Sequence, residues 1–252
     1  MQNQLNPKLH RPSSRLFLTF SPQRSGQHLI INWLCLGLNN TLHVNHVTQT
    51  KKTLLGKNLW SPLKGRTVLY NDQTVVDTGK ISPLFLPNLA QSDSHYENEL
   101  WSFEDTSPSE VIVAASYKIA IIRDPFNWLA STIKHGKWNK AQISVKARKY
   151  EKLIEEVNQS VCGNLYKICF DKFVIETSYR AEVSKLFSDH NFQAAEKALK
   201  QISDFGGGSS FTGISQSNLT EVTSRWRDLQ NNTTFKSIIE ENPALFRRGS
   251  EE

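Results

Sequence analysis

Eight residues, Ser21 to His28 (SPQRSGQH), have the types and order of a loop that binds an anion. They lie between Leu16 to Phe20, a run of strand-forming residues, and Gln27 to Leu38, where apolar residues recur at helical spacing. The free N–H groups and the positive dipole end of a helix that follows such a loop bind phosphate or sulfate. Arg24 would add a fixed positive charge, and Ser25 would add a hydroxyl donor.

The same loop departs from the nucleotide-binding pattern GxxxxGK[ST], because the second glycine and the lysine of that pattern are absent. This departure disfavours an ATP-hydrolysing P-loop. Gly26 would let an anion approach the backbone closely. An ordinary strand-to-helix turn, in which Ser25 caps the helix and Gly26 relieves strain, explains the segment equally well when it is taken alone.

A second segment, Arg123 to Ser131 (RDPFNWLAS), follows Lys118 to Ile122, a continuous apolar run typical of a buried strand. Arg123 at the strand end and Ser131 on the following helix are suited to bind one phosphate, the arginine through its charge and the serine through a hydrogen bond. Asp124 is suited to cap this helix, with the following proline in its first turn. The alternative is a solvated arginine beside a capped helix.

Taken together, the two segments resemble the sulfotransferase family, whose members transfer a sulfuryl group from 3′-phosphoadenosine 5′-phosphosulfate (PAPS). SPQRSGQHLIINWL is similar to that family's loop and helix for the 5′-phosphosulfate, often written PRSGxH. IAIIRDPFNWLAS is similar to its 3′-phosphate element, in which a serine stands eight residues beyond the arginine of Arg-Asp-Pro. The resemblance continues in KICFDKFVIETSYRAEVSKLF, in GGGSSFTG and in the pair Arg225-Trp226, and it covers about residues 16 to 230 with a poorly matched middle.

The resemblance implies a donor site made of two groups of residues. PAPS, as co-substrate, carries about four negative charges, so two arginines and oriented amides match it electrostatically. Gln23 stands where the common pattern has proline, and Leu29 replaces an aromatic residue found in many members. The 5′-phosphosulfate would be bound by Arg24, Ser25, Gly26, Gln27 and His28, and the 3′-phosphate by Arg123 and Ser131.

The resemblance also implies in-line sulfuryl transfer to a hydroxyl or amine of a small-molecule or glycan acceptor, without a metal ion. Arg24 would stabilise the negative charge of the leaving phosphate. A general base would take the proton of the acceptor. Glu104 is one candidate, because it follows a probable strand that comes just before the Arg123 strand, and some branches of the family use a glutamate in that region. His95 is its rival, because other branches use a histidine upstream of the same strand.

Two other functions fit the same residues. A kinase-like phosphotransferase would use Ser21 to His28 as a degenerate P-loop. A catalytically silent protein would bind the nucleotide as a regulatory or interaction module. Binding of adenosine 3′,5′-bisphosphate rather than ATP would indicate a sulfotransferase and not a kinase-like phosphotransferase. Formation of labelled product from sulfur-labelled donor would distinguish a sulfotransferase from a catalytically silent protein.

The two strand–turn–helix units indicate an α/β fold, since units of this kind build a parallel sheet with helices on its faces and ligands at the carboxyl ends of the strands. We expect a single domain over residues 16–245 with a central parallel sheet flanked by helices, and flexible ends at 1–15 and 246–252. The resemblance adds a P-loop-NTPase-like arrangement around the 5′-phosphosulfate-binding loop. Further strands are expected near 68–70, 74–76 and 165–170, and helices near 126–134, 145–157, 178–187, 193–202 and 219–229.

The composition limits the partners of the chain. It has 252 residues and a net charge of +6, but its basic residues are scattered, which favours a small polyanion over nucleic acid. No apolar run approaches the ~20 residues of a membrane span, and residues 1–15 lack the apolar core of a secretory signal. The three cysteines, Cys35, Cys162 and Cys169, show no metal-ligand spacing and fit a reducing compartment, so we expect a cytoplasmic protein.

Overall fold

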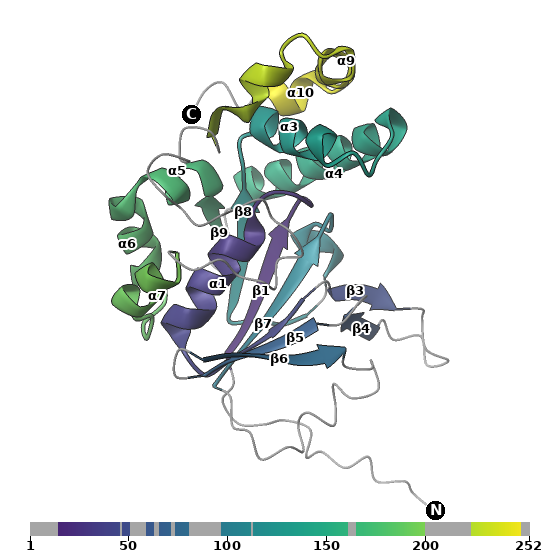
Figure 1. Ribbon diagram of the computed structural model, residues 1–252. Helices are drawn as coiled ribbons and strands as arrows, with labels where there is room; N and C mark the ends of the chain where they lie inside the picture. The colour runs from purple at the N-terminus through teal and green to yellow at the C-terminus, as the bar shows by residue number, and fades with distance from the viewer. Residues whose placement is uncertain are drawn as a thin grey trace, which may run out of the picture.

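A computed structural model describes residues 15–45, 47–50, 59–62, 66–71, 74–80, 97–111, 113–160, 165–199 and 223–247. Within these ranges the chain forms a seven-stranded sheet flanked by helices (Figure 1). In sheet order, its strands are β6 (Thr74–Lys80), β5 (Arg66–Asn71), β2 (Thr41–Val44), β7 (Asn98–Glu104), β1 (Arg15–Ser21), β8 (Tyr117–Ile122) and β9 (Leu165–Cys169). A separate pair consists of β3 (Val47–Thr50) and β4 (Leu59–Pro62).

The central part of the sheet is parallel. Strands β2, β7, β1, β8 and β9 run in one direction, which confirms the predicted α/β class with a central parallel sheet. The strands predicted near 68–70 and 74–76 are β5 and β6, and they add an antiparallel edge. Strand β1 lies between β7 and β8, and the three strands are parallel. The segments that follow them therefore emerge side by side, at the carboxyl ends of the strands.

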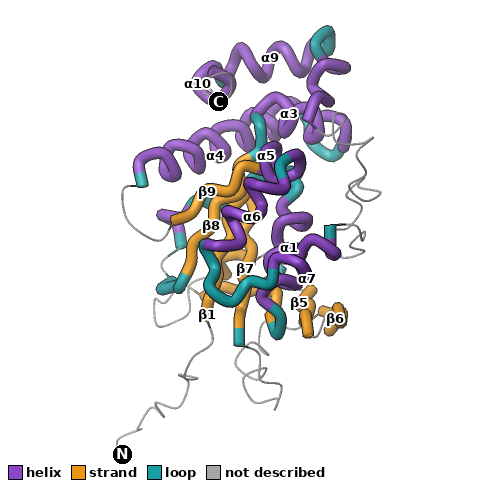
Figure 2. Tube along the Cα trace, turned by 90° about the vertical axis from the view of Figure 1, so that its left-hand side faces the viewer, coloured by secondary structure: helices purple, strands orange, loops and turns teal. Residues whose placement is uncertain are grey.

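Helices cover both faces of the sheet, because successive residues of a strand point to opposite faces. In β1, Phe17 belongs to one buried apolar cluster, and Leu18 and Phe20 belong to another. Figure 2 shows the two groups of helices that complete these clusters. The first group is α1 (Gln27–Leu38), α5 (Phe170–Ile175), α6 (Thr177–Lys185) and α7 (Phe192–Ala198), and the second is α3 (Pro125–His135), α4 (Lys140–Gln159), α9 (Thr233–Glu241) and α10 (Pro243–Arg247).

Local sequence signals set the helix boundaries. Helix α3 begins after Asp124, whose side chain accepts a hydrogen bond from the Asn127 N–H at 2.8 Å, and it ends before Gly136, which has a φ of +69°. Helix α4 begins with a capping box formed by Asn139 and Gln142. Helix α1 spans the predicted residues, and α3 and α4 contain the predicted ones.

Some predicted boundaries differ from the observed ones. The strand predicted over 165–170 ends at Cys169, because Phe170 already begins α5. The helix predicted over 219–229 ends as a 3-10 helix, η4 (Arg225–Leu229), and residues 219–222 lie outside the described part of the chain. The short strands β2, β3 and β4 are absent from the sequence-based prediction.

The ends of the described chain extend slightly beyond the predicted domain. Strand β1 begins at Arg15 and α10 ends at Arg247, and the side chain of Phe246 is buried in the core. Helix α10 thus includes residues 246 and 247. Residues 1–14 and 248–252 are not described. Among the described helices, none combines the length and the apolar character needed to cross a bilayer.

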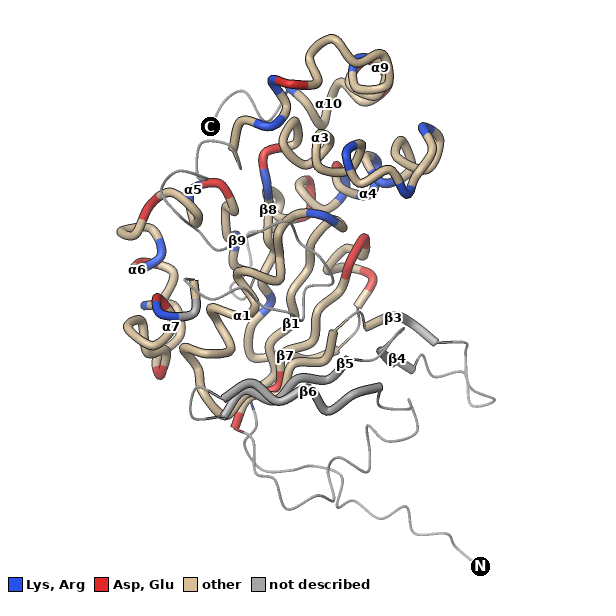
Figure 3. The backbone as a smooth tube through the Cα atoms, viewed as in Figure 1, with Lys and Arg blue, Asp and Glu red and all other residues tan. Residues whose placement is uncertain are grey.

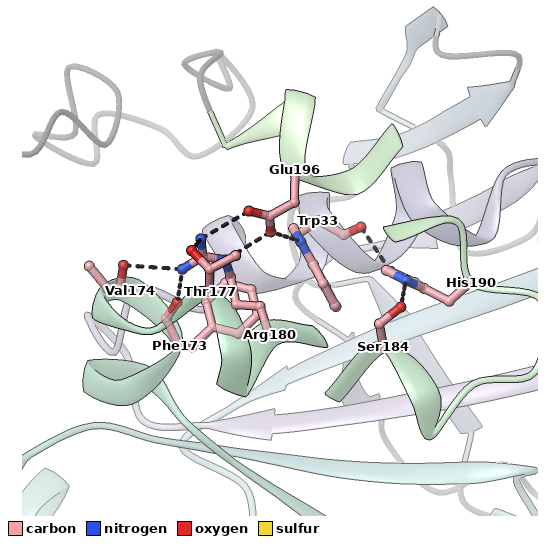
Figure 4. A network of polar contacts seen from close by, with 8 residues as sticks. All are labelled: Trp33, Phe173, Val174, Thr177, Arg180, Ser184, His190 and Glu196. Atoms are coloured by element: carbon pink, nitrogen blue, oxygen red, sulfur yellow. Dashed lines mark hydrogen bonds and ion pairs between the residues drawn. The ribbon is translucent and has the colours of Figure 1, made fainter. Parts of the chain in front are cut away.

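A buried polar network joins α1 to α6 and α7 (Figure 4). Arg180 on α6 donates from Nε and Nη2 to the carboxylate of Glu196 on α7, which also accepts from Trp33 Nε1 of α1 at 3.0 Å. The Nδ1 of His190 lies 2.7 Å from Ser184 Oγ, and its Nε2 lies 3.4 Å from the Trp33 carbonyl. Burial lowers the pKa of His190 to about 4, an effect that the Trp33 carbonyl and the charge of Glu196 only partly offset.

Acid is expected to destabilise the fold through His190. Its folded pKa of about 4 lies below the ~6.5 of an unfolded histidine, so its contribution is present above pH 6.5 and is lost as the pH falls toward 4. At pH 5 the loss is about 2 kcal/mol. Urea unfolding at pH 7 and pH 5 measures it: the wild-type protein should lose about 2 kcal/mol more than His190→Gln. Equal losses in the two proteins would contradict this prediction.

Candidate anion-binding site

The loop between β1 and α1 depends on glycine at one position. Gly26 has a φ of +82°, and a Cβ built there would lie 2.3 Å from Cε2 of Phe170. Arg24 also has a positive φ, of 71°, a conformation that residues with a side chain rarely adopt. Two left-handed residues within three positions therefore turn the backbone sharply where it enters α1.

Ser25 does not cap α1. The N-cap residue is Gly26, which has no side chain, and the first turn of α1 contains no acidic residue. The side chain of Ser25 is fully buried, and its Oγ has no hydrogen-bond partner among the described residues. The capped-turn alternative left open by the sequence is therefore wrong in this respect. A hydroxyl donor and the positive end of a helix both remain for an anion.

Arg123 lies beside this loop, although 99 residues separate it from Arg24. Its side chain is 2% exposed, and its Nη1 donates to the backbone carbonyl of Arg24 at 3.1 Å. Its guanidinium lies over the ring of Phe170, 5.0 Å from the centroid. Tyr150 on α4 fixes the backbone, because its Oη accepts from the Arg123 N–H at 2.8 Å and donates to the Arg123 carbonyl. Figure 3 shows basic segments beyond the ends of β1 and β8 at the same edge of the sheet.

The charge of a third guanidinium group, that of Arg225, acts on both Arg24 and Arg123. Burial lowers the pKa of Arg123 to about 10; the carboxylate of Asp171 opposes this effect and the charge of Arg225 adds to it. Burial also lowers the pKa of Arg24, where the charge of Glu104 opposes the effect and Arg225 again adds to it. Arg225 is thus close enough to repel both other arginines. A site that gathers partly buried like charges favours a polyanion, because binding relieves the repulsion.

Contacts between η4 and α3 bring Arg225 to the site. The Nδ2 of Asn127 donates to the carbonyl of Thr223 at 2.6 Å, and the ring centroids of Phe126 and Trp226 are 5.7 Å apart. In the sequence analysis, Arg225 appears only in the pair Arg225-Trp226, as part of the resemblance to sulfotransferases, and no role is predicted for it. Its approach depends on the packing of two segments about 100 residues apart, which no local pattern indicates.

Glu104, one candidate general base, is the last residue of β7 and lies opposite Ser21 in the β1–β7 register. One of its carboxylate oxygens accepts a hydrogen bond from Nε2 of Gln27, whose Oε1 accepts from Ser21 Oγ at 2.5 Å. Its charge raises the pKa of Arg24. The Glu104 carboxylate therefore borders the loop. The rival candidate, His95, is not among the described residues.

The remaining predicted residues lie on α1 and α3. His28 is half-buried on α1, and Ser131, in the second turn of α3, is 7% exposed. Asp124 caps α3 as predicted, and its backbone N–H donates to Oδ2 of Asp171 at 2.6 Å. Burial raises the pKa of Asp124 to about 6, with the N–H of Asn127 opposing the shift and Asp171 adding to it. The described residues include no group of three or more His, Cys, Asp or Glu side chains placed to bind a metal ion.

No model of a known protein family matches the chain, and no curated protein matches it. Among solved structures, the chain is similar to one described as "Sulfotransferase Domain from the Curacin Biosynthetic Pathway". The two share 14% sequence identity, and the match covers 92% of this chain and 98% of that chain with a TM-score of 0.48. The function of this chain is therefore inferred from its own residues.

Three residues that shape the site were missed by sequence reasoning. Phe170 packs against Gly26 and Arg123, Tyr150 holds the Arg123 backbone, and Asp171 accepts from the Asp124 N–H. In the sequence, an aromatic residue at a strand end and a tyrosine within a helix are ordinary core residues. Only the three-dimensional contacts give these side chains a place in the site.

Proposed function

We propose that this chain is a sulfotransferase that moves a sulfuryl group from PAPS to a hydroxyl or amine of a small-molecule or glycan acceptor. One observation carries the proposal: Arg24 and Arg123, each in a segment that resembles a PAPS-binding element, are joined by a direct hydrogen bond between Nη1 and a backbone carbonyl. The two segments follow adjacent strands, as one doubly phosphorylated ligand requires.

The donor residues divide between the two segments. Arg24, Ser25, Gly26, Gln27 and His28 bind the 5′-phosphosulfate in this proposal, and Arg123 and Ser131 bind the 3′-phosphate. The buried hydroxyl of Ser25 and the N-terminus of α1 support the first assignment. The buried guanidinium of Arg123 and the low exposure of Ser131 support the second.

The transfer itself is an in-line displacement at sulfur. The acceptor oxygen or nitrogen forms the new bond to sulfur, and the bond from sulfur to the phosphate oxygen breaks, with its electron pair leaving on adenosine 3′,5′-bisphosphate. Arg24 stabilises the charge that grows on this oxygen. Glu104 takes the acceptor proton, since its carboxylate borders the loop through Gln27, and His95 is the alternative base.

Thermal unfolding with two ligands tests the proposal. Adenosine 3′,5′-bisphosphate at about 100 times its Kd should add about 2.7 kcal/mol to the stability of the folded protein. ATP with Mg²⁺ should add much less. Stabilisation by ATP alone would overturn the proposal in favour of a phosphotransferase. Incubation with sulfur-labelled donor and a panel of phenol, alcohol, amine and glycan acceptors should then yield labelled product; donor binding without product would indicate a silent nucleotide-binding protein.

A further inference from the structure

Three polar side chains form a network beside the loop that carries Arg24. Gln23 lies in the loop, Asp105 directly follows β7, and Lys146 is on α4. Oδ1 of Asp105 accepts from the Gln23 N–H at 3.0 Å. The Lys146 ammonium donates to Oε1 of Gln23 at 2.6 Å and forms an ion pair with Oδ2 of Asp105. We call these three residues the Gln23 clamp.

Gln23, the residue that precedes Arg24, is held at both of its backbone polar groups, by the clamp at its N–H and by Trp128 at its carbonyl. The N–H of Gln23 is bound by Asp105, and its carbonyl accepts from Nε1 of Trp128 at 2.8 Å. Asp105 is itself anchored, because its N–H donates to the Ser21 carbonyl at 2.9 Å. With Gln23 held at both its backbone N–H and its carbonyl, the backbone of Arg24 is kept in its left-handed conformation, at a φ of 71°.

Burial strengthens this ion pair relative to others on the same helix. The side chains of Asp105 and Lys146 are each 14% exposed, and the Lys146 ammonium lies 4.5 Å from the centroid of the Trp138 ring. Lys152, also on α4, pairs with Glu110, but both of those side chains are 48% exposed. Solvent weakens such an exposed pair, so it contributes little. Lys152 is therefore a matched control for Lys146.

We propose that Asp105 and Lys146 are positioning residues, which act through Gln23 to hold Arg24 in the conformation that binds the anion. Proline, which the resembled pattern has at position 23, would restrict the loop through its fixed φ and has no N–H. Gln23 uses its N–H and its side chain instead, so the clamp restricts the loop in place of the proline ring. This inference rests on the proposed function for the identity of the anion, but not for the order of the loop.

Lys146→Met tests the clamp in the full-length protein, with Lys152→Met as control and Lys146→Arg as the conservative rescue. Hydrogen exchange of the peptide spanning 21–26, without ligand, should be about tenfold faster in Lys146→Met. Binding of adenosine 3′,5′-bisphosphate should weaken by about tenfold. Lys152→Met should match the wild-type protein in both measurements, and Lys146→Arg should recover most of both.

The outcomes separate the clamp from the proposed function. Exchange and binding in Lys146→Met that equal those of Lys152→Met would overturn the clamp. Faster loop exchange in Lys146→Met, in a protein whose wild type fails to bind adenosine 3′,5′-bisphosphate, would support the clamp and overturn the proposed function. If Lys146→Met does not fold, Gln23→Ala is measured instead, because it keeps the ion pair and removes one contact of the ammonium; loop exchange equal to wild type would then overturn the clamp.

Discussion

Arg24→Ala is expected to lower kcat/KM for sulfuryl transfer by about three orders of magnitude or more and to leave the protein folded. Removing one group that stabilises developing negative charge costs about 10²–10³ in rate, and Arg24 would also bind the donor in its ground state. The fold should tolerate the change, because the Arg24 side chain is partly exposed and its Nε has no hydrogen-bond partner among the described residues. Initial rates with labelled donor and thermal unfolding measure the two effects.

Two variants serve as controls for Arg24→Ala. Arg148→Ala, on the exposed side of α4, removes the same charge away from the site and should keep full activity. Arg24→Lys keeps the charge but loses the planar fork of donors, so its rate should lie between those of wild type and Arg24→Ala. Wild-type activity in Arg24→Ala would remove this residue from the mechanism.

Much of the fold was predictable because its signals are local. The helical spacing of apolar residues over Gln27–Leu38 gives the bounds of α1, and Asp124 with the following proline marks the start of α3. The order of the strands was not predictable in the same way. Strand β1 pairs with β7 and β8 because this order packs the apolar faces of the whole chain. A short stretch of sequence does not show which distant strands will pair.

In the candidate site, too, local features could be predicted from the sequence, and contacts between distant segments could not. The types of its central residues were evident, since an arginine and a serine before a helix, and an arginine at a strand end, suit an anion. The groups that position them were not evident. Asp105 lies 82 residues from Gln23 and Lys146 lies 123 residues from it, so the clamp appears only when three elements meet. Likewise, Arg225 reaches the site through η4 and α3.

Whether Ser25 caps α1 could be decided only from the backbone geometry of the loop. Its type fits a helix cap as well as an anion ligand, and the sequence leaves both open. The positive φ of Gly26 makes the glycine the N-cap residue and moves Ser25 into the loop, where its hydroxyl is buried. A difference of one residue in the start of a helix thus decides whether Ser25 caps α1 or leaves its hydroxyl in the loop.

Arg123→Met is expected to weaken binding of adenosine 3′,5′-bisphosphate by about 100-fold. A hydrogen bond between charged groups contributes about 1.5–3 kcal/mol, and this variant also loses the bond from Nη1 to the Arg24 carbonyl. Methionine can still pack on the Phe170 ring, so the apolar contact is kept. Isothermal titration measures the change in Kd. Arg180→Met is the matched control, because Arg180 is also a buried arginine but pairs with Glu196 away from the site.

The same variant should also change how stability depends on pH. Arg123 lowers the pKa of Asp124, so its removal raises that pKa further above its present value of about 6. A carboxyl group whose folded pKa is raised contributes stability at low pH and loses it as the pH rises through that pKa. Arg123→Met should therefore be destabilised by about 2–3 kcal/mol at pH 8 and by less at pH 5, where the Asp124 carboxyl is mostly protonated. Arg180→Met should lose stability but bind adenosine 3′,5′-bisphosphate like the wild-type protein. If Arg123→Met also binds it like the wild-type protein, the segments that carry Arg24 and Arg123 do not bind one ligand together.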